Sequence, residues 1–161
     1  MLDASERLAH ALELAYRYLN RRERSVSEVR KHLIDRGVGP VATEAAIEEL
    51  TQEGYLDDAR FARVLVEDKR TLELWGNERI GRMLLARGID RELAAAALST
   101  GGAGSDDESE RERALGLLRR RFPDPPRDRR ERERALGLLL RKGYESKLAL
   151  EALSDYGGAD R

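Results

Sequence analysis

The sequence predicts an all-α fold, arranged as an elongated tandem array of three three-helix repeats. Three stretches end on the same signal: an apolar pair, a pair that contains Arg or Lys, then Gly and an apolar or aromatic residue. The copies place Gly37, Gly88 and Gly143 at intervals of about 50 residues, which indicates multi-helix units stacked end to end. We find no alternating strand pattern of useful length.

The composition favours an elongated molecule with thin cores. Of the 161 residues, 40% are apolar and 38% are charged, so much of the molecule must be solvated surface. The chain has no Cys, which excludes disulfides and thiolate metal sites. No apolar run approaches the roughly 18 residues that span a bilayer, and the start of the chain lacks a secretory signal. We therefore expect a cytoplasmic protein without membrane contact.

Residues 1–55 form the first predicted unit. Ser25 and Glu28 match a capping box, in which each side chain satisfies a backbone N–H at a helix start. Gly37 suits the left-handed position after that helix, and Pro40 pre-sets the first turn of the next one. The helix that opens the unit has apolar residues at helical spacing, namely Ala9, Leu12, Ala15, Tyr16 and Leu19.

Residues 56–100 form the second predicted unit. Asp57 is the expected N-cap of its first helix, and Leu56 with Phe61 should form a hydrophobic staple around that cap. Trp75 then marks a turn. A second helix follows and ends at the second repeated glycine, and a short Ala-rich helix completes the unit.

Residues 101–108 are predicted to be a flexible linker with an acidic run. Small residues without an apolar period give way there to Asp and Glu, and Ser105 with Glu108 repeats the capping pattern. The joint at residues 55–58 is too short to let the first two units swing. The Gly-rich joint, by contrast, should let the third unit move.

Residues 109–161 form the third predicted unit. Its first helix stops at the proline-rich residues 123–126, and Asp128 with Glu131 caps the next helix. That helix ends at the third repeated glycine. A final short helix is expected at residues 147–153.

No constellation of catalytic or metal-binding residues stands out. The two histidines, His10 and His32, lie on different predicted helices, and neither has a carboxylate at ligand spacing. Asp57 and Asp58 could be paired catalytic carboxylates, but an N-cap followed by a first-turn charge explains them better. The Gly-rich stretch lacks the strand and the Lys of a phosphate-binding loop. We therefore expect a non-enzymatic binding protein without metal or cofactor.

Positive charge gathers in the third unit. Residues 111–142 hold 12 Arg or Lys and 5 Asp or Glu, a net charge of +7, although the whole chain has a net charge of −1. One interpretation is a solvated helix face with i,i+4 ion pairs. The other is a footprint for nucleic-acid phosphates or for an acidic protein groove. The candidate binding residues are Arg119, Arg120, Arg121, Arg127, Arg129, Arg130, Arg132 and Arg134.

A helix-turn-helix reader of duplex DNA fits the sequence poorly. The second helix of such a motif enters the major groove and must tolerate phosphate. The third helix of the first unit has four Glu residues and no Lys or Arg between Pro40 and Glu53. Phosphates would repel it, so sequence-specific duplex readout is disfavoured.

Several motifs, in order, resemble those of the RecX family of bacterial recombination regulators. Residues 54–62, with the sequence Gly-Tyr-Leu-Asp-Asp-Ala-Arg-Phe-Ala, are similar to the family's signature. Residues 25–37, 75–89 and 138–144 resemble its three repeats. The resemblance implies three tandem three-helix units. The matched positions, which are mainly structural, include Gly37, Tyr55, Leu56, Asp57, Asp58, Phe61, Trp75, Gly88 and Gly143.

The resemblance also implies a function in homologous recombination, DNA repair and the SOS response. A RecX-like protein would bind in the groove of the RecA–DNA filament and hold back ATP hydrolysis, filament growth and strand exchange. Its partner would be RecA, with single- or double-stranded DNA as a further contact, and the protein would act as a monomer without catalysis. The residues alone leave two alternatives open: a nucleic-acid-binding protein acting through the Arg-rich third unit, and a helical scaffold for another partner.

Overall fold

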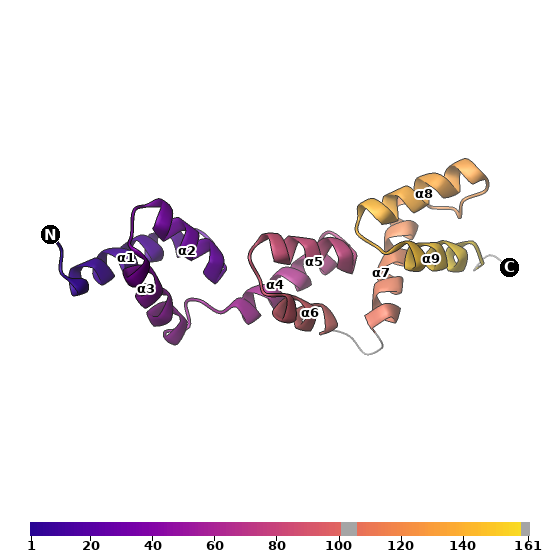
Figure 1. Cartoon of the computed structure of the whole chain (residues 1–161). Helices are drawn as coiled ribbons and strands as arrows, with labels where there is room; N and C mark the ends of the chain where they lie inside the picture. The colour runs from indigo at the N-terminus through magenta and orange to yellow at the C-terminus, as the bar shows by residue number, and fades with distance from the viewer. Residues whose placement is uncertain (101–105, 159–161) are drawn as a thin grey trace.

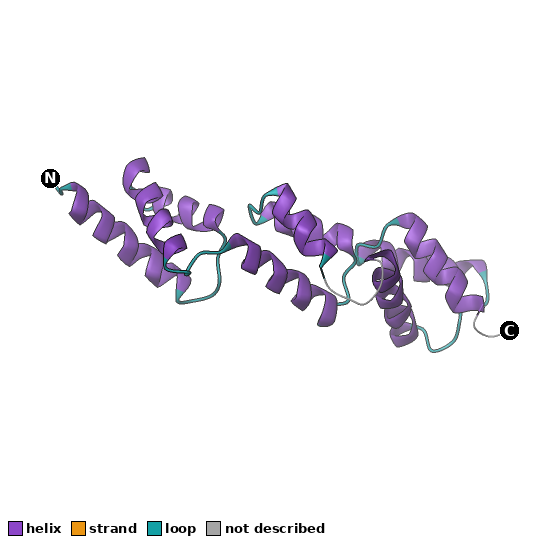
Figure 2. Ribbon diagram, turned by 90° about the horizontal axis from the view of Figure 1, so that it is seen from below, coloured by secondary structure: helices purple, strands orange, loops and turns teal. Residues whose placement is uncertain are grey.

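The computed structural model describes residues 1–100 and 106–158, with side chains in the second range from residue 109 onward. Within these ranges the chain forms nine α-helices and no strand. Figure 1 shows them in three groups along an elongated molecule, with the two termini at opposite ends. Figure 2, seen from below, shows helices joined by short loops. The predicted all-α class and the repeated three-helix units are therefore confirmed.

The helices follow one another in a regular order. Their bounds are α1 Ala4–Leu19, α2 Val26–Asp35, α3 Pro40–Gln52, α4 Asp58–Thr71, α5 Asn77–Ala86, α6 Arg91–Ser99, α7 Asp106–Arg121, α8 Arg129–Arg141 and α9 Ser146–Gly158. Helices α1–α3 make unit one, α4–α6 unit two and α7–α9 unit three. In each unit the first helix packs against the third, and the second helix closes the core.

Each unit has its own small hydrophobic core. The buried apolar side chains form three separate clusters, one in each group of helices. A thin core of this kind needs few apolar residues, because each helix buries only one stripe. The charge-rich composition is therefore accommodated by shape rather than by a single large core.

The repeated glycines end the second helix of each unit, as predicted. Gly37, Gly88 and Gly143 have φ values of 81°, 79° and 93°, in the left-handed region that favours glycine. At each end the N–H after the glycine donates to a carbonyl five residues back, at 3.0 to 3.1 Å, in the Schellman pattern. The left-handed turn satisfies carbonyl groups that the helix leaves without partners.

Within the described residues, the predicted N-caps at Ser25, Asp57 and Asp128 are confirmed, with one change at Ser25. The side chains of Ser25, Asp57 and Asp128 each accept a bond from the backbone N–H three residues on. At Ser25 only this half of the expected capping box forms. The Glu28 carboxylate, which we expected to bond back to Ser25, is bound by Arg87 of unit two instead.

The predicted hydrophobic staple is also corrected. Leu56 is 1% exposed and packs into the core of unit one, whereas Phe61 belongs to the core of unit two. The N–H groups of Tyr55 and Leu56 both donate to the carbonyl of Leu50 at the end of α3. The chain therefore leaves unit one only after Leu56, which anchors the connection between the units.

Unit three differs from expectation at both ends. Helix α7 begins at Asp106, so the backbone of residues 106–108 is helical where we expected linker. The Ser105 cap and the glycines before it lie outside the described residues. Helix α9 extends to Gly158 rather than stopping near residue 153, because Tyr156 is buried in the unit's core and its hydroxyl donates to the carbonyl of Phe122.

Candidate functional site

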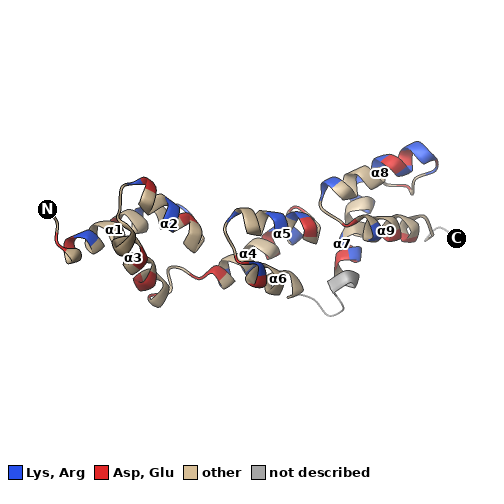
Figure 3. Cartoon of the chain, viewed as in Figure 1, with Lys and Arg blue, Asp and Glu red and all other residues tan. Residues whose placement is uncertain are grey.

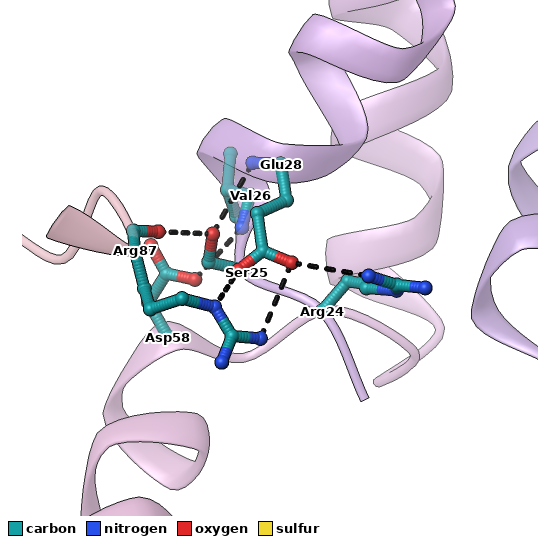
Figure 4. A network of polar contacts seen from close by, with 6 residues as sticks. All are labelled: Arg24, Ser25, Val26, Glu28, Asp58 and Arg87. Atoms are coloured by element: carbon teal, nitrogen blue, oxygen red, sulfur yellow. Dashed lines mark hydrogen bonds and ion pairs between the residues drawn. The ribbon is translucent and has the colours of Figure 1, made fainter. Parts of the chain in front are cut away.

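Units one and two meet at a small polar joint (Figure 4). The Ser25 side chain is fully buried, and its hydroxyl donates to the carbonyl of Arg87 at 2.6 Å. The same oxygen accepts from the N–H of Glu28 at 3.2 Å. A hydroxyl can donate and accept together, so one residue caps α2 and bonds the end of α5.

A carboxylate of unit two caps a helix of unit one. The Asp58 side chain accepts from the N–H of Val26, the first residue of α2, at 2.9 Å. Burial raises the pKa of Asp58, and this hydrogen bond to the N–H opposes the rise. The first-turn role that we expected for Asp58 is therefore incomplete, because its carboxylate also satisfies an N–H at the start of another helix.

Arg87 completes this joint from the end of α5. Its guanidinium binds the Glu28 carboxylate, which has a second cation, Arg24, at 3.7 Å. The Arg87 and Glu28 side chains are 25% and 17% exposed, so their ion pair is partly shielded from water. The same guanidinium lies over the ring of Phe61, 5.0 Å from its centroid.

Gly88 lets the two units approach closely, with its backbone against the side chain of Ser27. A Cβ atom added at Gly88 would collide with the Cβ and Oγ atoms of Ser27 in the first turn of α2. The glycine therefore serves two needs, a left-handed turn and a close approach between units. The sequence motif indicated only the first.

Units two and three meet at an equivalent joint. The N–H of Gly76 donates to the carbonyl of Lys142 at 2.8 Å, and the N–H of Glu78 donates to the carbonyl of Gly143 at 3.1 Å. A Cβ at Gly143 would collide with Arg79, and one at Gly76 would collide with Gly143. The start of α5 thus sits against the end of α8, as the start of α2 sits against the end of α5.

Further contacts reinforce the second joint. The buried Tyr144 hydroxyl donates to the carbonyl of Leu74 at 2.7 Å, and burial raises the pKa of Tyr144 to about 12. The Glu110 carboxylate accepts from the N–H of Asn77 at 2.8 Å. We expected the Gly-rich stretch to let unit three move. Residues 101–105 lie outside the described part of the chain, but the described residues tie units two and three together directly.

Trp75 is a structural residue of the second joint. It is 6% exposed, with the Arg79 guanidinium 3.8 Å and the Lys69 ammonium 4.6 Å from its ring centroid. Of the aromatic motif residues Tyr55, Phe61 and Trp75, Tyr55 is the exposed one, with its ring packed edge-on against Tyr16 at 5.3 Å. Most residues of the family motifs therefore stabilise the cores of the units or the joints between them.

The predicted basic surface contains a groove between the end of α7 and α8. Figure 3 shows Lys and Arg gathered on α8. A cavity of about 640 Å³ is lined by the guanidinium-bearing residues Arg121, Arg130, Arg134 and Arg141, with Phe122, Glu133 and Leu138. We call this cavity the arginine groove. Its carboxylate, Glu133, is paired with Arg129 outside the groove at 2.9 Å. Among the described residues the four lining arginines have no ion pair, so the groove can take up an anion.

The structure divides the eight predicted arginines into three sets. Arg121, Arg130 and Arg134 line the groove. Arg127 and Arg129 form short-range pairs on the surface with Asp124 and Glu133. The other three, Arg119, Arg120 and Arg132, are exposed outside the groove. Arg141 was missed, because it lies 20 residues beyond Arg121 in sequence, and only the folding of α7 and α8 around the core of unit three places both beside one cavity.

No catalytic or metal site emerges from the part of the chain that the structure describes. Over residues 1–100 and 106–158 there is no group of three or more potential metal ligands. The His32 ring stacks on Tyr18 at 3.9 Å, and its pKa is lowered chiefly by burial. None of the described helices combines the length and apolar character needed to cross a membrane.

Comparison with known proteins agrees with this architecture. Models described as RecX, first three-helix domain, and RecX, second three-helix domain, match residues 11–50 and 57–98. A Regulatory protein RecX from Xanthomonas axonopodis pv. citri is 38% identical over 128 residues, which cover 79% of this chain and 75% of that protein. A Regulatory protein RecX from Lactobacillus delbrueckii subsp. bulgaricus is 38% identical over 94 residues, but the match spans only 35% of its length.

A solved structure shares the fold over nearly the whole chain. The crystal structure of RecX from Lactobacillus salivarius aligns with a TM-score of 0.80, covering 94% of this chain and 97% of that one. At 20% identity this likeness speaks for the fold alone. The Xanthomonas relative and the two matched domains indicate common ancestry with RecX proteins. Together they confirm the resemblance seen in the motifs, and the chain belongs to the RecX family.

Proposed function

We propose that this chain regulates homologous recombination and DNA repair by binding in the groove of the RecA–DNA filament. There it restrains ATP hydrolysis, filament growth and strand exchange. Membership of a family of regulatory proteins supports the proposal. The observation that carries it is the array itself, in which hydrogen bonds at both joints hold three units end to end. A long surface of fixed spacing can contact several subunits of a polymer, so that weak contacts add up.

The decisive experiment measures ATP hydrolysis by preformed RecA filaments on single-stranded DNA. Adding the purified chain at a several-fold excess over RecA should lower the hydrolysis rate, because a bridging array opposes the subunit changes that hydrolysis requires. Heat-denatured chain at the same concentration is the control for protein added in bulk. An unchanged rate with the folded chain would refute the regulatory proposal.

The arginine groove supports a second candidate function, direct contact with DNA phosphates. Guanidinium groups bind phosphate oxygens in a bidentate manner, and four of them line one cavity. Phe122, the aromatic residue of the groove, also packs against the core of unit three. Backbone contact therefore suits the groove better than base stacking.

Salt dependence tests this second function. For single strands, log affinity should fall by roughly 0.7 per log unit of salt for each phosphate neutralised. Replacing Arg121, Arg130 and Arg134 together by Ala should therefore reduce the slope by about 2. The matched control replaces the three exposed arginines outside the groove, which are Arg119, Arg120 and Arg132. If both triple variants flatten the slope equally, the groove has no special part in binding DNA.

A further inference from the structure

The ends of α2, α5 and α8 are built alike but are covered differently. The end of α5, at Arg87 and Gly88, lies under the first turn of α2, and the end of α8 lies under the first turn of α5. The corresponding end of α2, at Arg36 and Gly37, is open. Among the described residues, nothing lies within 4 Å of a Cβ atom added at Gly37. We call this surface, formed by residues 34–37, the open end.

The two covered ends show what such a surface binds. At each one, a donor at the start of one helix binds a carbonyl at the end of another. At the first joint the Ser25 hydroxyl donates to the carbonyl of Arg87, and at the second the N–H of Gly76 donates to the carbonyl of Lys142. The positive end of one helix dipole thereby meets the negative end of another. The carbonyls of Arg36 and Gly37 have no such donor within the described part of the chain.

The basic residue before the glycine also has a partner at each covered end. Arg87 binds the Glu28 carboxylate in the first turn of α2, and the Lys142 ammonium donates to the carbonyl of Glu73 at 3.2 Å. The equivalent residue of the open end, Arg36, is exposed and has no ion pair in the described residues. It is therefore placed to receive a carboxylate as Arg87 does.

The surroundings of the open end are positively charged. A shallow cavity of about 250 Å³ beside it is lined by Arg17, Arg21 and Arg36, with Leu14, Tyr18 and His32. The charge of Arg17 is neutralised by an ion pair with Glu13, but Arg21 and Arg36 have no ion pair among the described residues. The open end therefore favours an acidic helix start.

A second copy of this chain is a poor match for the open end. Among α2, α5 and α8, the helix whose start is not covered by the end of another of the three, within the described residues, is α8, and its N-cap is Asp128. A carboxylate accepts hydrogen bonds but cannot donate to a carbonyl as Ser25 does. The first-turn carboxylate of α8, Glu131, already accepts from the N–H of Arg127 at 2.7 Å, so it is not free to face Arg36 of another copy.

We propose that the open end binds the first turn of a helix of the regulated protein, with a carboxylate in that turn facing Arg36 and a hydroxyl or N–H donor facing the Arg36 carbonyl. This inference rests on the proposed function, in which the regulated protein is RecA. The inference adds a specific contact to the proposed function. Unit one would bind its partner through the same kind of joint that links the units of the chain itself.

Two matched pairs of variants test the proposal by their affinity for RecA filaments, measured as fluorescence anisotropy of the labelled chain. Gly37→Asn puts a side chain where the partner helix would lie, and Asn tolerates the left-handed conformation. Gly54→Asn is its control, because Gly54 has a φ of 82° and also has nothing within 4 Å. Arg36→Glu reverses the charge of the open end, and Arg22→Glu does so at an exposed residue outside the cavity.

We expect Gly37→Asn and Arg36→Glu to weaken binding by about tenfold or more, and both controls to remain within about twofold of the unsubstituted chain. If the unsubstituted chain binds but all four variants bind equally well, the open end is not a contact and the regulatory proposal stands. If the unsubstituted chain does not bind RecA filaments, both proposals fall.

A photoreactive residue at Ile34, which is 52% exposed beside Arg36, identifies the occupant directly. Crosslinks to the first turn of a RecA helix that carries Asp or Glu would support the proposal. Crosslinks to a second copy of this chain, or to RecA segments away from helix starts, would overturn it.

Discussion

Gly88 and Gly37 have nearly the same backbone conformation, so replacing each by Ala separates the cost of the turn from the cost of the joint. Their φ values are 79° and 81°. An alanine in this region costs about 1–2 kcal/mol at either position. At Gly37 the new methyl group meets nothing within 4 Å, whereas at Gly88 it collides with Ser27. Forced overpacking of this kind costs about 1–3 kcal/mol more.

Urea unfolding followed by circular dichroism measures this difference. With a slope of about 2 kcal/mol per molar urea, the midpoint of Gly88→Ala should lie about 0.5–1.5 M below that of Gly37→Ala. The slope itself should be unchanged, because both variants expose the same surface on unfolding. Equal midpoints would mean that units one and two do not press together at Gly88, and the joint described here would be wrong.

Three further predictions concern the joints and are tested on single variants. Ser25→Ala should cost more in unfolding free energy than Asp128→Ala, by about 1 kcal/mol, because both lose an N-cap but only Ser25 also donates across a joint. Tyr144→Phe should cost about 1 kcal/mol through the lost bond to the Leu74 carbonyl, and an unaltered stability would argue against that bond. The unfolding free energy of Asp58→Asn, relative to that of the unsubstituted chain, should increase with pH. The increase should occur between the pKa of Asp58 in the unfolded chain, near 3.8, and its raised pKa in the folded chain. Over that window the folded state holds more of the Asp58 proton, so stability falls with rising pH, and Asn removes this loss. A constant difference between the two proteins at every pH would contradict it.

Local features of the fold could be predicted because they depend on neighbours in sequence. The left-handed glycines, the N-caps at Ser25 and Asp57 and the helix start at Pro40 all follow from the chemistry of one turn. The repeat of one glycine signal gave the array, because each copy had to end an equivalent helix.

The contacts between units could not be predicted in the same way. Asp58 caps a helix that begins 32 residues earlier, and Glu28 turns away from its own cap to bind Arg87, 59 residues later. Sequence rules for helix starts assigned each carboxylate to its own helix, where it would also have found a favourable interaction. Only the placement of one unit against the next decides between these partners.

The arginine groove shows the same limit at the candidate site. The charge of the third unit was evident from the sequence, and the eight exposed arginines were identified from it. The sequence did not show which of them converge, because Arg127 and Arg129 have local carboxylates while Arg121 and Arg141 meet only through helix packing.

The central claim is that two polar joints hold three units at a fixed spacing. The chain has no Cys, so two introduced cysteines at the exposed residues Glu48 on α3 and Glu151 on α9 would take spin labels selectively. Rigid joints should give a single narrow distribution of distances between the label in unit one and the label in unit three, measured by pulsed electron paramagnetic resonance. A broad distribution, typical of units moving on flexible links, would contradict it.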